Sequence, residues 1–365
     1  MIPTTTRLLS LDVFRGFIMC LLAMESTGLY EHIQASVAPD SFFNNILNQF
    51  FHHPWHGLRF WDLIQPAFMF MAGISLAYSL TSQRDKGYTW TQSLYKTLRR
   101  CGWLFFWGVL DYAVRPGGLS FELWDVLTQL SFTTLIAFLI FYWKPWHQII
   151  VCLILLLLTE ILYRYTHIPD FDQPFVDQHN FGNWMDHILM NKINKGGWVA
   201  INIIPTAVHT IAGALAGKWL MDKKNLVFKD ILIWAAICLG IGYIMDLAGI
   251  TPIIKRIATT SFTLVSLGWC LLGLLFFYWW VDIKNHRRYT LFFIVLGMNS
   301  LFIYLFFEII GSRWFNGYIS AIATGVMNMF SASDHVSAIV GSMCIFGLEW
   351  GLCWWLWRKK IFFKL

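Results

Sequence analysis

Charged residues are scarce in this chain of 365 residues. Asp, Glu, Lys and Arg make up 13% of it, while hydrophobic residues make up 57%. Soluble globular domains carry roughly 25% charged residues, so the composition excludes an ordinary soluble domain. The net charge of +6 gives no reason to expect a nucleic acid as partner, because basic loops on one face of a membrane explain it.

Cysteine is also sparse, and its seven copies are scattered. All of them lie in or beside apolar runs, and no two have the C-x-x-C spacing of a metal or redox site. We therefore expect no metal centre, no permanently bound cofactor and no external disulfide, and we interpret the cysteines as apolar packing residues. No internal repeat is evident, which disfavours a transporter built from inverted repeats.

Long apolar runs are abundant. A run of about 20 residues can cross the hydrocarbon core of a bilayer as a helix. Ten such runs follow one another, at 12–31, 60–82, 101–115, 124–143, 148–166, 199–221, 229–250, 258–282, 289–311 and 334–357. A shorter run at 316–330 is predicted to be a non-spanning hairpin or an interfacial helix. We expect an all-α integral membrane protein, with about ten transmembrane helices in one bundle and a single membrane domain over residues 1–365.

The positions of lysine and arginine predict the orientation of these helices. With the N- and C-termini in the cytosol, 19 of the 27 basic residues lie inside, as the positive-inside rule requires. Most histidines then lie outside, in or near the loops 32–59 and 167–198. Such loops suggest binding or chemistry on the outer face, and a merely solvated loop is the alternative. Small-residue pairs such as Gly73/Ala77 and Gly213/Gly217 predict close helix packing.

The loop before the second apolar run carries the densest group of ionisable side chains. His52, His53 and His56 are followed by Asp62, near the start of a predicted helix. A charge inside hydrocarbon costs about 3 kcal/mol on insertion scales, so a carboxylate at this position is expected to have a functional role. Imidazole beside carboxylate is the pair that general-base catalysis uses.

Other polar residues lie near the ends of the runs or in the outer loop 167–198. Asp12 and Arg15 are three apart and can pair on one helix face, either as a structural anchor or in binding. Asp, Asn and Trp together suit a sugar, with a polar loop under interfacial tryptophans as the alternative. The outer residues predict a polar cavity and are candidates for the acceptor: Glu25, Ser26, Trp184, Asp186, Trp198, Lys255, Ser261 and Asn299.

An ordered set of motifs resembles the transmembrane acyltransferase family that includes heparan-α-glucosaminide N-acetyltransferase and its bacterial relatives. The matching pieces extend over nearly the whole chain: Arg7-x-x-Ser10-x-Asp12-x-x-Arg15-Gly16, His52-x-Pro54-Trp55-x-Gly57-Leu58, Asp62-Leu63, Pro66, Ala216-Gly217-Lys218, Pro252-x-x-Lys255, Ser261, Val281-Asp282-Ile283-Lys284 and Gly297-Met298-Asn299-Ser300. Two pieces depart from the family pattern, with Thr128-Gln129 in place of Gln-Arg and Glu25-Ser26 in place of Asn.

The resemblance implies transfer of acetyl from cytosolic acetyl-CoA to the amine of a glucosamine-type sugar or glycan across the lipid bilayer. It places the catalytic histidine on His52, three residues before Trp55, and its partner on Asp62. It also implies a homodimer and the inner membrane of a bacterial cell. Residues for the CoA side are Asp12, Arg15 and Gln129, with Arg99, Arg100, Lys223, Lys224, Arg287 and Arg288 as candidates for its phosphates.

Three alternatives stay open from the sequence. The same residues suit an O-acyltransferase for surface polysaccharide. His52 and Asp62 would also serve as a proton relay in a transporter for a sugar or glycolipid. An acetyl-His52 intermediate is the alternative to direct transfer. With an ordinary imidazole, the rate is expected to rise with pH around a pKa of roughly 6.5.

Overall fold

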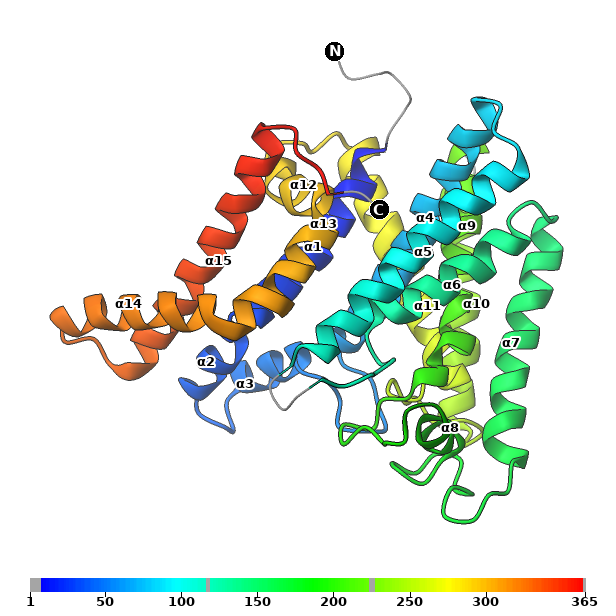
Figure 1. Ribbon diagram of the computed structural model, residues 1–365, viewed down its shortest axis with the longest axis horizontal. Coiled ribbons are helices and arrows are strands. Elements are labelled where there is room, and N and C mark those ends of the chain that lie inside the picture. Colours follow the sequence, from blue (N-terminus) through cyan, green and yellow to red (C-terminus); the bar gives the residue numbers. More distant parts are fainter. Residues whose placement is uncertain (1–7, 116–118, 223–226, 364–365) are drawn as a thin grey trace. The chain divides into compact units, whose positions relative to one another are not determined.

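The computed structural model describes residues 8–115, 119–222 and 227–363. These residues form helices and loops without a β-strand in the described ranges, as the all-α prediction requires. Three basic residues named above, Arg7, Lys223 and Lys224, lie outside the described residues. The helices form two compact units (Figure 1), unit 1 with residues 1–51 and 273–364 and unit 2 with residues 52–272.

Unit 2 is a bundle of long helices with one short helix in the loop 167–198. Its elements are η2 (Phe60–Leu63), α4 (Ile64–Asp85), α5 (Trp90–Ala113), α6 (Val126–Ile140), α7 (Pro145–Tyr165), α8 (Phe181–Met190), η3 (Ala200–Asn202), α9 (Ile203–Asp222), α10 (Val227–Leu247) and most of α11 (Thr260–Phe277). The most apolar stretch of α9 is 78% buried, against 28% for α7 and 22% for α10. Hence α9 is the central helix, and α7 and α10 present apolar faces outward.

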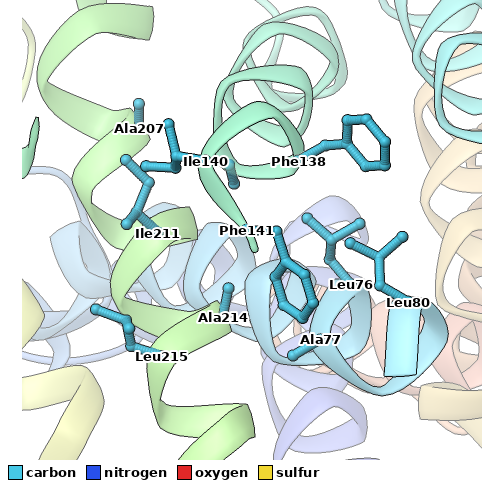
Figure 2. Close-up of a cluster of buried hydrophobic side chains, with 11 residues drawn as sticks. Leu76, Ala77, Leu80, Phe138, Ile140, Phe141, Ala207, Ile211, Ala214 and Leu215 are labelled. Carbon is cyan, nitrogen blue, oxygen red and sulfur yellow. The ribbon is translucent and has the colours of Figure 1, made fainter. Parts of the chain in front are cut away.

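The close contact of α4 with α9 depends on glycine, as the small-residue pairs predict. A β-carbon on Gly73 would overlap the carbonyl oxygen of Thr210, and one on Gly213 would overlap that of Phe70. Beside this contact, buried side chains of α4, α6 and α9 form one cluster (Figure 2), in which Phe138 and Ile211 take part. The cluster packs α4, α6 and α9 together.

Unit 1 consists of both ends of the described chain. Its elements are α1 (Leu9–Ser26), α2 (Leu29–Ala35), α3 (Phe42–Leu47), η1 (Asn48–Phe50), the end of α11, the π-helical turn η4 (Tyr278–Ile283), α12 (Thr290–Met298), α13 (Ser300–Leu305), the π-helical segment η5 (Phe306–Phe315), α14 (Asn316–Met329) and α15 (Asp334–Arg358). Helix α1 packs against α12 through glycine as well, because β-carbons on Gly16 and Gly297 would overlap backbone of the facing helix.

The first helix has no capping side chain of its own. The carboxylate of Asp282 takes that place, since it accepts hydrogen bonds from the backbone N–H groups of Leu9 at 3.3 Å and Ser10 at 3.2 Å. An anion at a helix N-terminus satisfies free donors and complements the helix dipole. Asp282, which belongs to a motif of the resemblance, therefore ties the start of α1 to the end of the π-helical turn.

The structure contains fewer obvious spans than the sequence predicts. Among the described residues, six helices are long and apolar enough to cross a membrane, or seven if Thr290–Met298 and Ser300–Met329, bent by 72°, count as one. Each predicted run does contain a helix, but α6 has only 15 residues and α1 carries Asp12, Arg15 and Glu25. A multi-pass helical membrane protein is thus supported, and the number ten stays a prediction. The run at 316–330 is the single helix α14.

Candidate active site around His52

A histidine and a carboxylate meet at the start of η2. Nδ1 of His52 lies 3.2 Å from Oδ1 of Asp62. The other oxygen of Asp62 accepts hydrogen bonds from the backbone N–H of Arg59 at 2.9 Å and of His53 at 3.3 Å. The Asp62 side chain is 1% exposed. Its donors hold it as a buried anion facing one nitrogen of the imidazole, which is the pair that the sequence predicts.

Lys255 joins this pair from a loop almost two hundred residues further along the chain. Its Nζ lies 3.0 Å from Nδ1 of His52 and 3.6 Å from Oδ1 of Asp62. Its side chain is 6% exposed. The sequence predicts Lys255 as a ligand of the acceptor, whereas the structure brings its ammonium into contact with His52 and Asp62.

Pairing between two loops brings Lys255 close to His52 and Asp62. The backbone N–H of Gly57 donates to the carbonyl of Ile253 at 2.8 Å, and His56 forms an isolated antiparallel bridge with Ile254. The His56 ring also contacts Asp246 at 2.8 Å, and Asp246 accepts from the backbone N–H of Ile253 at 2.8 Å. Gly57 has a φ of 140°, which L side chains rarely adopt. The loop of His52 is therefore fastened to the loop of Lys255.

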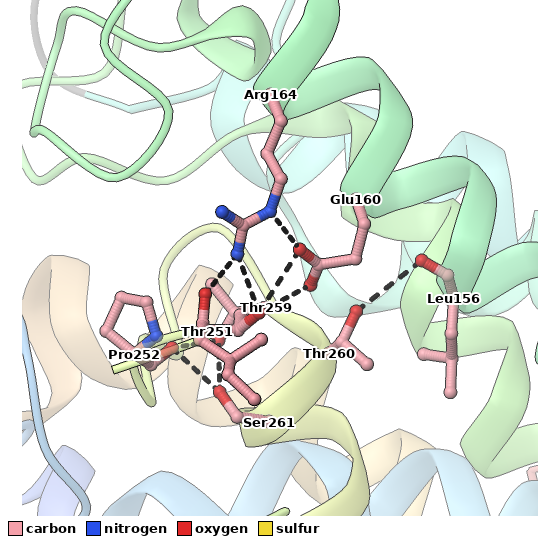
Figure 3. Close-up of polar contacts among 9 residues, drawn as sticks. Leu156, Glu160, Arg164, Thr251, Pro252, Thr259, Thr260 and Ser261 are labelled. Carbon is pink, nitrogen blue, oxygen red and sulfur yellow. Dashed lines mark hydrogen bonds and ion pairs between the residues drawn. The ribbon is translucent and has the colours of Figure 1, made fainter. Parts of the chain in front are cut away.

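The loop of Lys255 is in turn held on α7 (Figure 3). Arg164 forms an ion pair with Glu160 at 2.7 Å and donates to the hydroxyl of Thr251 at 2.9 Å. Thr259, in the loop, and Ser261, in the first turn of α11, both donate to the carbonyl of Pro252, at 2.7 and 2.8 Å. Ser261, predicted as a substrate ligand, is fully buried and stabilises this loop instead.

An indole ring forms one wall of the site. The ring centres of Trp198 and His52 lie 5.5 Å apart in an edge-to-face arrangement. The cations of Lys255 and Arg256 lie 5.3 and 5.9 Å from the centre of the Trp198 ring, within the range of cation–π attraction. The loop 167–198 thus reaches the site through Trp198.

The charge state of His52 follows from this surrounding. Partial burial of the ring and the positive charge of Lys255 lower the pKa of His52 to about 4, against the opposing influence of Asp62. Even so, 39% of the side chain stays exposed. The imidazole is therefore neutral and accessible at neutral pH, with a pKa well below the ordinary value expected from the sequence.

The other residues predicted from the loop 167–198 lie in its own packing. Asp186 is fully buried and accepts from the Trp124 indole N–H and the backbone N–H of Ala200, both at 2.8 Å. Burial raises the pKa of Asp186 to about 7. Trp184 packs on Phe181 in the hydrophobic cluster of this loop. Both residues thus hold the loop in place, and Trp198 is the residue that meets His52.

The residues predicted for the CoA side divide between the units. Gln129 on α6 is buried and accepts from the amide of Gln65 at 2.8 Å. Arg99 and Arg100 lie on α5, also in unit 2. In unit 1, Arg15 lies 3.9 Å from Asp12, which confirms the predicted pairing within α1.

The remaining acceptor candidates belong to unit 1. Glu25 and Ser26 end α1, and the carbonyl of Ser26 accepts from the side chain of Asn316 at 2.9 Å. Asn299 is buried and binds the backbone of Ile361 and Phe363 near the end of the chain. The structure gives Asn299 a role in holding that segment.

Sequence reasoning missed two contributors to the site, Arg59 and Arg256. Arg59 donates to the carbonyl of His52 at 3.1 Å as well as to Asp62. Its position three residues before Asp62 could have indicated this contact, because an acidic side chain at the third position of a helix often accepts from the backbone N–H of the N-cap residue. In the part of the chain that the structure describes, no cluster of His, Cys, Asp and Glu is arranged to hold a metal ion.

No family model matches this sequence. Over an alignment of 437 positions the chain is 23% identical to a mouse (Mus musculus) protein named heparan-alpha-glucosaminide N-acetyltransferase. The alignment covers 99% of this chain and 61% of the mouse protein, so the chain spans about three fifths of its length. The chain is thus a distant homologue of an N-acetyltransferase, with helices that suit a multi-pass membrane protein.

Proposed function

We propose that this protein is a membrane acetyltransferase that moves acetyl from cytosolic acetyl-CoA to the amine of a glucosamine-type sugar outside a bacterial inner membrane. One observation carries the proposal: a neutral, accessible imidazole lies against a buried carboxylate in a chain similar to an N-acetyltransferase. Trp198 supports it, because an indole beside His52 offers a flat surface on which a sugar ring can stack.

The acid–base step is assigned to Nε2 of His52, because Nδ1 faces Asp62. The acceptor amine attacks the thioester carbonyl, a C–N bond forms and the C–S bond breaks. Nε2 takes the proton from the amine and returns it to the departing thiolate, so CoA leaves as a free thiol. Asp62 orients the ring and stabilises the transient imidazolium. Such general-base assistance is typically worth about 10²–10⁴-fold in rate.

The direct test is product formation by the purified protein. It is incubated with labelled acetyl-CoA and a panel of amino sugars, with release of free CoA thiol followed in parallel. N-acetylated sugar and stoichiometric thiol are expected, and both should vanish in His52→Ala. Acylation of hydroxyls alone would identify an O-acyltransferase. Solute movement in liposomes without thiol release would identify a transporter and overturn the proposal. Peptide mass spectrometry of quenched single turnovers reports whether acetyl-His52 forms.

Sidedness has its own test. Positions 86 and 172 are both exposed, and the proposed topology puts the first in the cytosol and the second outside. Lys86→Cys and Asp172→Cys are labelled in intact cells with a membrane-impermeant maleimide, with the parent chain as control for Cys344. Only position 172 should react beyond the control. Labelling of position 86 alone would reverse the topology and exclude transfer across the membrane in the proposed direction.

A further inference from the structure

One nitrogen of His52 lies close to two groups, one of which can only accept a hydrogen bond while the other can only donate one. Nδ1 lies 3.2 Å from Oδ1 of Asp62 and 3.0 Å from Nζ of Lys255. An ionised carboxylate only accepts hydrogen bonds, and an ammonium only donates them. Nδ1 can therefore donate a hydrogen bond to Asp62 only when Nδ1 carries the proton. It can accept one from Lys255 only when Nδ1 carries the lone pair.

The two arrangements correspond to the two neutral tautomers of imidazole. If Nδ1–H donates to Asp62, the lone pair is on Nε2 and His52 can act as a base there. If Lys255 donates to Nδ1, the proton is on Nε2, and His52 can donate a hydrogen bond but cannot accept a proton. The contact that the lysine makes thus decides whether the histidine is competent as a base.

The distances favour the second arrangement in the structure as it stands. Nζ of Lys255 is closer to Nδ1, at 3.0 Å, than to Oδ1 of Asp62, at 3.6 Å. Two backbone N–H groups donate to the other oxygen of Asp62, and the ammonium of Lys255 lies near Oδ1, so the carboxylate keeps compensating partners when Nδ1 carries the lone pair. A hydrogen bond from a charged donor is also stronger than one between neutral groups.

We propose that Lys255 is a positioning residue that keeps His52 in the Nε2–H tautomer until a sugar oxygen of the acceptor takes over the N–H donors of the lysine. Nδ1 then donates to Asp62 and Nε2 becomes the base. The face of Trp198, 5.3 Å from Nζ, offers the displaced ammonium a favourable neighbour. This inference rests on the proposed function for the acceptor, while its structural part concerns His52 and Lys255 alone.

The charged neighbours of His52 are few enough to isolate the lysine. Asp62 faces the ring, Lys255 contacts Nδ1, and Arg256 lies further away beside Trp198. Arg59 donates to the backbone carbonyl of His52 and not to its ring. Replacement of Lys255 alone therefore changes the contact at Nδ1 and leaves the other charges in place.

The test measures the lone pair of Nε2 directly. Diethyl pyrocarbonate acylates an unprotonated imidazole nitrogen with loss of ethanol and carbon dioxide, and tandem mass spectrometry assigns the adduct to individual histidines. At pH 8, His52→Gln defines the background, and modification of His53 is the internal reference. Lys255→Met, of similar length but without a donor, should make His52 about tenfold or more reactive, since a charged hydrogen bond shifts such a ratio at least that far. Lys255→Arg, which keeps donors, should resemble the parent.

A pH series separates this role from mere loosening of the site. Loss of the lysine charge should raise the pH at which His52 becomes half-reactive in Lys255→Met, because Lys255 lowers the pKa of His52. Equal reactivity and an unchanged midpoint in a folded Lys255→Met variant would overturn the inference. These readouts need no acetyl transfer, so they stand even if the proposed function fails. If acetyl transfer is observed but the reactivity of His52 is unchanged in Lys255→Met, only the proposed role of Lys255 is contradicted.

Discussion

The two units treat a buried carboxyl group in opposite ways. In unit 2, Asp62 accepts hydrogen bonds from two backbone N–H groups and lies 3.6 Å from the ammonium of Lys255. In unit 1, Glu349 on α15 is 1% exposed, and neither of its side-chain oxygens has a hydrogen-bond partner among the described residues. A buried charge is tolerated only where donors compensate its lost hydration. Asp62 is thus compensated as an anion, whereas no described donor compensates Glu349.

The units are alike in how their helices approach each other. In unit 2 the α4–α9 contact requires Gly73 and Gly213, and in unit 1 the α1–α12 contact requires Gly16 and Gly297. Close backbone contact through small residues is the usual way in which helices associate in lipid. The difference between the units therefore lies in their buried polar groups and not in their helix packing. This difference favours unit 2 as the location of a catalytic site.

The largest expected effect is at the centre of unit 2. His52→Ala should lower acetyl transfer by at least about 10²–10⁴-fold, because the base acts in the chemical step. Binding of acetyl-CoA should stay largely intact. Single-turnover transfer and equilibrium binding of labelled acetyl-CoA measure the two quantities.

The neighbouring histidines are matched controls for this prediction. His53→Ala and His56→Ala should cost far less activity, although His56 contributes to the contact with Asp246. If His53→Ala were inactive while His52→Ala kept near-normal turnover, the assignment of the base would be wrong.

The two carboxyl groups should respond oppositely to neutralisation. Asp62→Asn leaves Lys255 buried without its anion, and loss of one partner of a buried pair typically destabilises by about 3–5 kcal/mol. Glu349→Gln or Glu349→Leu should change stability by less than about 1 kcal/mol or raise it, because no described donor is abandoned. Thermal unfolding in detergent gives both values. Similar losses in the two variants would show that Glu349 has a compensating partner.

The glycine contacts should be equally sensitive in both units. Gly16→Ala and Gly213→Ala should each destabilise by about 1–3 kcal/mol, since the added methyl overlaps backbone that cannot move freely. Gly102 on α5 and Gly240 on α10 are suitable controls, because a β-carbon there meets nothing within 4 Å. Their replacement by Ala should leave stability unchanged or raise it by about 0.5–1 kcal/mol. Thermal unfolding of the four variants tests the comparison.

The smallest expected effect concerns pH. It distinguishes the lowered pKa that the structure indicates for His52 from the ordinary pKa expected from the sequence. With a pKa of about 4, the imidazole of His52 stays neutral down to mildly acidic pH and loses its lone pair only below that range. An ordinary imidazole, with a pKa of roughly 6.5, would be about thirtyfold depleted in the neutral form at pH 5. Acylation of His52 measured against pH gives the midpoint without interference from the acceptor amine. A midpoint near 6.5 would contradict the burial described here.

The same shift has a consequence for stability. The folded state binds fewer protons than the unfolded state between pH 4 and 6.5, because the pKa of His52 is lowered on folding from 6.5 to about 4. Stability should therefore fall as pH decreases through this window.

The pairing of His52 with Asp62 was predictable because the two residues are ten apart, across one loop and a helix start. The approach of Lys255 to Nδ1 was not, since nothing local fixes a distance over such a separation. Ser261 and Asn299 illustrate a second limit: a polar side chain near a helix end can bond a ligand or the protein's own backbone, and both choices give the same sequence pattern. The count of ten spans stays a prediction, because helices that polar residues interrupt, such as α1, cannot be assigned as spans by length and composition alone.

Because Gly57 pairs with Ile253, the length of the loop before Ile253 determines which residue contacts the imidazole of His52. The pairing includes one isolated bridge, at Ile254, and Lys255 begins the turn that follows it. A slip of one residue would therefore replace the ammonium of Lys255 at His52 with the aliphatic Ile254 or the guanidinium of Arg256. A single deletion between Asp246 and Ile253, which touches no residue at the imidazole, would thus remove its cationic neighbour as surely as a substitution. Insertions and deletions in this short segment are therefore expected to disturb the site as much as a substitution of Lys255.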